Sequence, residues 1–205
     1  YELIGKTRDD AAGECFDKVA KLLELDYPGG PKISKFALEG NPSAIPFPRP
    51  MLNESNYDFS FAGLKTAALY WLRDHELSAI RVNQIKLVAG VYGHLPEPPT
   101  IYDFCASFEQ AIVDVLVEKT IRAAEVYKPK TIILAGGVSA NKKLCETLRA
   151  SVAQALPKSD IRHPISEYCM DNGAMIAVVG YYKAIKKEFT PWQKIKADPN
   201  WKIYE

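Results

Sequence analysis

The clearest chemical signal in the sequence is a pair of glycines, Gly136 and Gly137, followed by a polar turn that ends at Asn141. Glycine has no Cβ, so a ligand can approach the backbone closely at such a pair. A helical pattern begins at Lys142, and the free N–H groups at a helix start suit polar or anionic ligands. The pattern indicates a nucleotide-type site at the carboxyl end of a strand, although an ordinary tight strand-to-helix turn contains the same residues.

A second group of candidate residues consists of three carboxylates near the N-terminus, Asp10, Glu14 and Asp17. Their spacing of four and three residues places them on one face of a helix. Such a stripe can accept hydrogen bonds from the hydroxyl groups of a sugar. It is also typical of a solvated helix face paired with Lys18 and Lys21, and spacing alone favours this second interpretation.

A third candidate is Asp171, which stands just before the last apolar helical pattern of the chain. An aspartate at that position is commonly the N-cap of the helix. Its functional alternative is a ligand or a general base held at the start of a helix. The sequence alone leaves both roles open.

The cysteines and histidines do not form a recognisable site by themselves. The four cysteines contain no CxxC pair, and the three histidines show neither HxxxH nor HExxH spacing. Scattered cysteines favour reduced thiols in a cytoplasm over a disulfide framework or a zinc site. The net charge of +1 neither requires nor excludes nucleic acid binding, and no apolar run is long enough to predict a membrane span.

The elements that position these residues follow from hydrophobic periodicity and capping signals. The predicted strands are Tyr1–Lys6, a buried strand over Thr131–Leu134, and Ser159–His163. The predicted helices run from Thr7, with Asp10 completing a capping box, to about Leu25; from Ile101 to Tyr127; and from Lys142 to about Leu156. A last helix opens just after Asp171 and runs to about Lys187. This order predicts an α/β fold.

The remaining segments read as turns and irregular structure. Gly29 and Gly30 lie between two prolines and predict a rigid turn with φ values open only to glycine. Residues 80–92 fit either a helix or a linker. We predict four segments: 1–32, an irregular and partly helical insertion at 33–100, 101–188, and an irregular packed tail at 189–205. The strand-like opening at Tyr1 is expected of a piece of a longer protein.

Six sequence blocks, taken in order, resemble the C-terminal part of one protein family. The blocks are GKTRDDAAGECFDKVAKLLELDYPGGP, FPRP, DFSFAGLKTA, FEQAIVDVL, LAGGVSANKKL and MDNGAMIA. They resemble the TsaD family, the tRNA threonylcarbamoyladenosine transferases, over residues 1 to about 185. The resemblance implies an actin-like ATPase fold in which this chain is most of the second, ribonuclease-H-like lobe without its first strands.

The resemblance also implies an activity with its cofactors and partners. The family transfers threonylcarbamoyl from threonylcarbamoyl-AMP to N6 of adenosine 37 in ANN-decoding tRNAs, so the nucleotide ligand is this adenylate or ATP/ADP. One divalent metal, Fe²⁺ or Zn²⁺, is held by an HxxxH pair that this chain lacks and by one aspartate. Bacterial members work with an actin-like paralogue, TsaB, and an ATPase, TsaE. This chain alone is expected to be cytoplasmic and inactive.

The family's functional positions transfer to this sequence one by one. By resemblance, Asp17 binds the ribose, the backbone at Gly30 approaches the nucleoside, Gly136 and Gly137 line the adenosine, Asn141 binds the adenylate, and Asp171 is the metal ligand. No catalytic group is assigned beyond that ligand.

Two positions depart from the family pattern. Ser34 stands where many archaeal relatives carry an acidic residue, and Met170 replaces the threonine of the TDN block. The glycine-rich SGGH block expected to contact the acyl-phosphate end is not in this chain. A non-catalytic nucleotide-binding scaffold of the actin-like fold is the alternative function.

Overall fold

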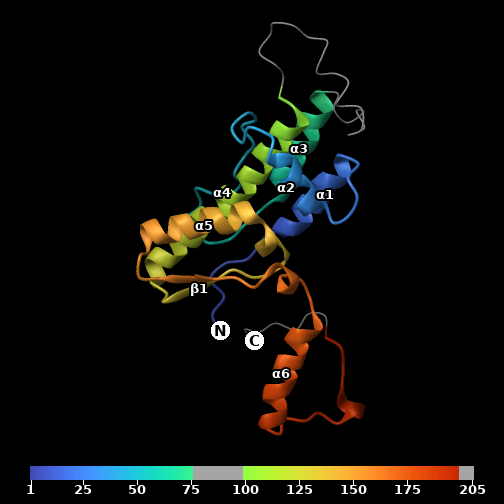
Figure 1. The fold of residues 1–205 in the computed structure, drawn as a ribbon, viewed down its shortest axis with the longest axis vertical. Helices are drawn as coiled ribbons and strands as arrows, with labels where there is room; N and C mark the ends of the chain where they lie inside the picture. The colour runs from blue at the N-terminus through green and yellow to red at the C-terminus, as the bar shows by residue number, and fades with distance from the viewer. Residues whose placement is uncertain (76–98, 199–205) are drawn as a thin grey trace, which may run out of the picture.

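The computed structural model describes residues 1–75 and 99–198, so the segment 80–92 lies outside the described residues (Figure 1). The described part is mostly helical, with one small parallel sheet. Its elements in chain order are α1 Ala12–Leu22, α2 Gly29–Ala37, α3 Ala62–Asp74, α4 Ile101–Tyr127, β1 Thr131–Ile133, α5 Lys142–Ala155, β2 Asp160–Arg162 and α6 Gly173–Ile185. Short 3-10 helices cover Gly137–Ala140, Ser166–Tyr168 and Trp192–Lys194.

Helix α4 is the centre of the packing, and it has the predicted bounds. It begins at a capping box in which the side chain of Thr100 accepts from the backbone N of Asp103, and it ends where Lys128 takes a left-handed conformation. Its aromatic side chains are core residues, as predicted: Phe104 and Phe108 are fully buried. Apolar burial along a helix of this length is the main stabilising contribution that it can make.

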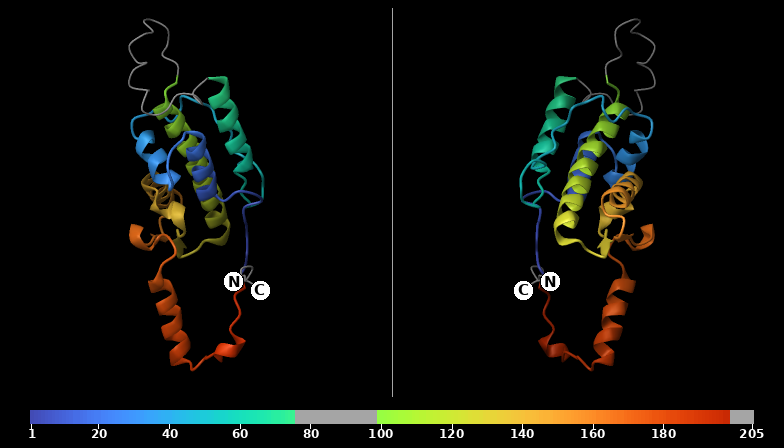
Figure 2. Two further views of the ribbon diagram at one scale, coloured as in Figure 1. Left: turned by 90° about the vertical axis from the view of Figure 1, so that its right-hand side faces the viewer. Right: turned by 90° about the vertical axis from the view of Figure 1, so that its left-hand side faces the viewer.

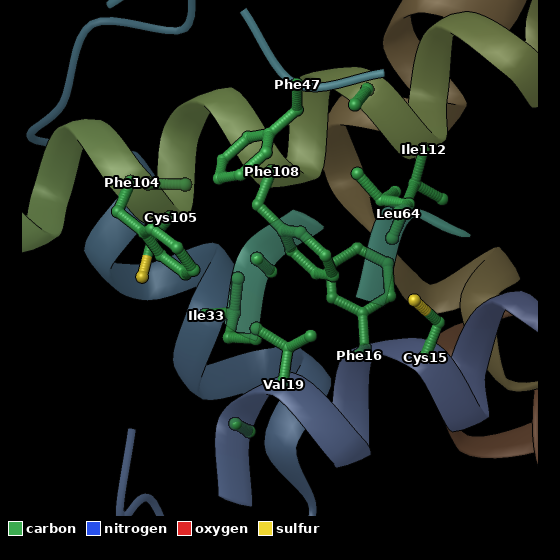
Figure 3. Close-up of a cluster of buried hydrophobic side chains, with 14 of the residues drawn as sticks. Cys15, Phe16, Val19, Ile33, Phe47, Leu64, Phe104, Cys105, Phe108 and Ile112 are labelled. Atoms are coloured by element: carbon green, nitrogen blue, oxygen red, sulfur yellow. The ribbon is translucent and has the colours of Figure 1, made fainter. Parts of the chain in front are cut away.

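The main core lies between α4 and the helices α1, α2 and α3 (Figure 3). Phe16 of α1 meets Phe108 edge-on with ring centroids 5.6 Å apart, and Phe47 meets Phe104 in the same way at 5.3 Å. Ile33 of α2 and Leu64 of α3 belong to the same cluster. The described part of the predicted 33–100 segment therefore shares its core with α1 and α4, while the predicted domain boundaries stay predictions.

The small sheet packs against α5 and the second half of α4. Strands β1 and β2 are parallel, with Thr131 opposite Asp160 and Ile133 opposite Arg162. Ile132 faces the cluster, but Ile133 is 72% exposed. The prediction of a buried strand is thus wrong for Ile133, because in the described part of the chain helices cover only one face of this sheet and strand side chains alternate between faces.

The N-terminal segment differs from its prediction in two ways. Residues 1–6 form no strand, and only Thr7 makes a parallel bridge, to Phe59. Helix α1 begins at Ala12 and not after Thr7, because the carboxylate of Asp9 accepts from the backbone N of Phe61 at 2.8 Å and so ties this segment to the start of α3. The predicted capping box at Thr7 is wrong.

The glycine pair after α1 opens a helix instead of forming a glycine-only turn. Gly29 and Gly30 are the first residues of α2, and the one described glycine with positive φ is Gly136. Gly29 is required for another reason: a Cβ there would lie 2.3 Å from the Cβ of Ala20. The predicted backbone conformation is wrong, because both glycines are helical. Glycine is required at position 29 by the close contact between α1 and α2, and not by a special φ value.

Helix α6 stands away from the other helices (Figures 1 and 2). It is apolar, yet none of its residues is buried in the described structure. The predicted packed tail also differs, since Phe189 and Trp192 are 74% and 78% exposed; Trp201 lies outside the described residues. Among the described helices, none combines the length and the apolarity needed to cross a membrane.

Candidate functional site

Asp17 holds the start of α2. The half-buried Asp17 lies on α1, and its Oδ1 accepts a hydrogen bond from the backbone N of Gly29 at 2.8 Å. Helix starts leave backbone N–H groups without partners, and a carboxylate satisfies them well. The other carboxylate oxygen has no hydrogen-bond partner in the described part of the chain, so it is available to a ligand.

An open hollow of about 490 Å³ lies beside Asp17. It is lined by residues of α1, of the connection to α2 and of the start of α2, namely Glu14, Asp17, Lys18, Lys21, Leu25, Asp26, Tyr27 and Gly29. The lining combines carboxylates, amines and one exposed aromatic ring. Ligand sites commonly combine apolar lining with a few polar groups that orient the ligand, and the carboxylates here can accept hydrogen bonds from hydroxyl groups.

Part of the carboxylate stripe is neutralised within the protein. Lys18 pairs with Asp10 at 2.6 Å and with Glu14 at 2.7 Å. Hydrogen bonds from Lys18 and Lys65 lower the pKa of Asp10, and the hydrogen bond to Asp10 in turn raises the pKa of Lys18. The predicted stripe of three carboxylates on one helix face is wrong for Asp10, because α1 begins at Ala12 and Asp10, only 14% exposed, is held before the helix by Lys18 and Lys65. The solvated-face interpretation holds for Glu14, whereas Asp17 accepts from the start of α2.

The two glycines of the pair after β1 have different surroundings. Gly136 adopts φ +87°, a conformation that favours glycine, and a Cβ there would meet nothing within 4 Å. At Gly137 an added Cβ would lie 2.8 Å from the Sδ of Met170, but this side chain is flexible and 58% exposed and can move aside, so the contact does not require glycine. Space is thus open at Gly136, while Met170 occupies the space at Gly137 and brings the residue before Asp171 to the glycine turn.

Asn141 joins three helices through one side chain. Its Oδ1 accepts from the backbone N of Leu144 at 2.8 Å and so caps α5. Its Nδ2 donates to the Oε1 of Glu109 on α4 at 2.7 Å and to the Oγ of Ser34 on α2 at 3.0 Å. The glycine turn is therefore fixed beside α2, the helix that Asp17 caps.

Sequence reasoning missed Glu109, although a signal was present. Glu109 is only 4% exposed, and it falls on the face of α4 that carries Cys105, Ile112 and Val113, all buried. A carboxylate at an apolar helix position is unusual without a partner. Helical periodicity alone was sufficient to mark it, but its partner is 32 residues further along the chain.

Asp171 lies at the surface and is not the helix N-cap. Asn172 has that role, because its Oδ1 accepts from the backbone N of Met175 at 3.1 Å. The N-cap alternative for Asp171 is therefore wrong. Asp171 accepts no hydrogen bond within the described residues, and no cluster of three or more histidine, cysteine, aspartate or glutamate side chains suited to a metal occurs among them.

The predicted site residues are thus connected, but they do not all share one hollow. The hollow contains Asp17 but not Gly30, Asn141 or the glycine turn. The connection runs through Asn141 and Ser34, and also through Gly13 of α1, where an added Cβ would lie 3.4 Å from Val138. The structure therefore places Asp17 and the glycine turn around neighbouring parts of α1 and α2.

Comparison with known proteins gives a consistent result. A sequence model of the family TsaD, described as tRNA N6-adenosine threonylcarbamoyltransferase, matches residues 1–178. Proteins of that name from Desulfitobacterium hafniense, Moorella thermoacetica and Thermosipho africanus are 46%, 45% and 42% identical to this chain, over 94%, 92% and 98% of its length. The aligned region is 51%, 50% and 54% of those relatives, so the chain spans about half the length of the curated relatives that it matches.

Proposed function

Since the chain belongs to the TsaD family of tRNA N6-adenosine threonylcarbamoyltransferases, we propose that it provides the adenylate-binding lobe of an enzyme of t6A biosynthesis. This enzyme transfers threonylcarbamoyl from threonylcarbamoyl-AMP to N6 of adenosine 37 in ANN-decoding tRNAs. In the actin-like fold of the family, the chain corresponds to most of the second lobe. One observation carries the proposal: the hydrogen bond from Asn141 to Ser34 holds the glycine turn beside the helix that Asp17 caps.

Asp17 is suited to bind the ribose of the adenylate. Its Oδ1 is engaged by Gly29, and its second oxygen is free to accept a hydrogen bond from a ribose hydroxyl. The hydrogen bond to the start of α2 fixes the carboxylate before the ligand arrives. A fixed acceptor costs less conformational entropy on binding than a mobile one.

The glycines at 30 and 136 are suited to the nucleoside. A Cβ at Gly30 would meet Phe16 only at 3.8 Å, an ordinary contact, so the fold does not require glycine there. Gly136 leaves open space above its backbone. Both positions therefore offer backbone without a side chain to a flat ligand. Because packing within the protein does not require glycine at position 30, ligand binding is the proposed reason for it.

In the proposed reaction, the N6 amine of adenosine attacks the carbamoyl carbon of the adenylate. A C–N bond forms, the C–O bond to the phosphate breaks, AMP leaves, and the amine loses a proton. The exocyclic amine is a weak nucleophile, so holding the two substrates in line supplies most of the acceleration. The residues of this chain contribute by binding and orienting the adenylate, and none is assigned as a general base.

Asp171 is proposed as one ligand of an Fe²⁺ or Zn²⁺ ion. Its exposed carboxylate has no protein partner among the described residues and can offer an oxygen ligand. One carboxylate does not hold a metal alone, so the remaining ligands are proposed to be the HxxxH histidines of the family. Such a metal, when bound, polarises oxygen atoms of the substrate.

The proposed partners are tRNA, TsaB and TsaE, with action in the cytoplasm. Helix α5 carries three cations, the exposed Lys142 and Arg149 and the half-buried Lys143, and cations of this kind can contact tRNA phosphates. A solvated helix face remains the simpler interpretation of these three residues. No residue of this chain is assigned to the interface with TsaB or TsaE.

Transfer of threonylcarbamoyl to tRNA tests the proposal directly. The assay uses the complete protein that carries this chain, with TsaB, TsaE, tRNA and radiolabelled threonine. We expect product with the unaltered protein and a loss of at least tenfold with Asp17→Ala, while Asp74→Ala, an exposed control outside the hollow, stays active. Adenylate binding without any transfer would contradict the enzyme proposal and favour the scaffold alternative.

A further inference from the structure

We propose that Glu109 is a positioning residue that fixes the orientation of the Asn141 side chain, so that Asn141 offers its Oδ1, and not its amide hydrogens, to the adenylate. The inference rests on the proposed function, because it assumes that Asn141 contacts the nucleotide. It assigns a role to a buried carboxylate on α4 that has no other function in the proposed site.

The orientation of the Asn141 amide follows from its partners. The backbone N–H of Leu144 can only donate, so the atom of Asn141 that faces it at 2.8 Å must be the oxygen. The amide nitrogen then faces Glu109 at 2.7 Å and Ser34 at 3.0 Å. A flipped amide would place two donors against each other at Leu144 and two acceptors against each other at Glu109.

These contacts use every donor of the Asn141 side chain. An amide nitrogen carries two hydrogens, and one goes to Glu109 while the other goes to Ser34. The oxygen has two lone pairs, and only one is used, by Leu144. Asn141 can therefore accept one further hydrogen bond, which fits a hydroxyl or amine donor of an adenylate.

The burial of Glu109 is costly for folding, which supports a functional reason for it. Its side chain is 4% exposed, and within the described residues it pairs with no lysine or arginine; its hydrogen-bond partner is the Asn141 amide. A buried carboxylate without a cation normally destabilises a fold relative to an apolar residue. The function that offsets this cost is the orientation of the Asn141 side chain by Glu109.

The test is a double-mutant cycle on AMP affinity, measured by calorimetry with the complete protein that carries this chain. Glu109→Met keeps the volume of the side chain but removes the acceptor, and we expect the Kd for AMP to rise about tenfold. Glu109→Gln retains an acceptor and should restore affinity to within about threefold. In the Asn141→Ala background, Glu109→Met should have no further effect, because the group it orients is gone.

Controls separate this role from general destabilisation. Glu118→Ala removes an exposed carboxylate from the same helix and should leave the AMP affinity unchanged. Each variant is melted thermally, and affinity is compared only among folded proteins. If Glu109→Met does not fold, Glu109→Ala replaces it, and the ¹⁵N resonance of the Asn141 side-chain amide, which should shift in Glu109→Gln, gives a second readout.

The outcomes distinguish the inference from the proposed function. Equal losses from Glu109→Met with and without Asn141 would overturn the positioning role, as would an unchanged affinity in Glu109→Met when Asn141→Ala weakens binding. Absence of AMP binding by the unaltered protein, or full affinity in Asn141→Ala, would overturn the nucleotide assignment of Asn141 and the positioning role with it.

Discussion

Asp17 is expected to have two separable roles, in stability and in nucleotide binding. One oxygen caps α2 through the backbone N of Gly29, and the other is free for the ribose. Loss of a helix cap costs about 1 kcal/mol, within a range of about 0.5–2 kcal/mol. Loss of a hydrogen bond from a ligand to a charged group costs about 1.5–3 kcal/mol, which is about 10- to 150-fold in Kd.

Two substitutions separate the roles. Asp17→Ala removes both interactions, so we expect a loss of about 1 kcal/mol in the free energy of unfolding and a Kd for AMP raised about 10- to 150-fold. Asp17→Asn keeps an oxygen for Gly29 but loses the charge. It should therefore retain most of the stability while still weakening AMP binding, because the acceptor for the ribose is neutral.

The measurements are urea unfolding followed by circular dichroism and AMP titration by calorimetry. Asp26→Asn is the matched control, because the exposed Asp26 lines the same hollow but pairs only with Lys32 and caps no helix. Its stability should be unchanged within error. If Asp17→Ala lowers stability and leaves the Kd for AMP unchanged, the ribose role is refuted. If stability is unchanged as well, the capping role is refuted too.

Three further predictions follow from single contacts. Gly29→Ala should destabilise the protein by about 1–3 kcal/mol, because the added Cβ overpacks against α1. Gly30→Ala should leave the stability within about 0.5 kcal/mol of the unaltered protein but weaken AMP binding. Equal unfolding midpoints of the two variants in urea would contradict this contrast. The hydrogen bonds from lysines, that of Lys18 first, hold the pKa of Asp10 below its ordinary 3.8, so their stabilising contribution is present above this pH and is lost as pH falls through the lowered pKa. Asp10→Asn should therefore flatten the fall in urea midpoint below about pH 4, and an equally steep fall would exclude these pairs as the cause. Asp171→Ala in the complete protein should reduce bound iron or zinc, measured by mass spectrometry, to less than about a tenth, and unchanged metal content would remove Asp171 from the ligand set.

Elements defined by local signals could be predicted from the sequence. The bounds of α4 were predicted correctly because its capping box and its left-handed end lie within a few residues of the helix. The strands around 131–133 and 160–162 and the start of α5 at Lys142 were also found, because a short run of β-favouring residues and a polar turn before a helical pattern are local signals as well. The family followed from six short blocks in a fixed order, a property of the sequence itself.

The errors arose where a partner far along the chain decides the local structure. Helix α1 begins late because Asp9 bonds to the backbone of Phe61, 52 residues away. The glycine at 29 is needed because Ala20 of the preceding helix packs against it, and no φ preference shows this. The exposure of Ile133 likewise depends on which face of the sheet the helices cover.

The sequence by itself determined the family of this protein and pointed to its candidate site residues, because residue types and their order carry that information directly. Only the tertiary structure decided how those residues are held in position. Asn141 is fixed by Glu109 and Ser34, which are 32 and 107 residues away in the chain, and the side chain of Met170 lies against Gly137. Periodicity and capping rules describe neighbours within a few residues, whereas the geometry of a site is set by contacts between segments that meet only after folding.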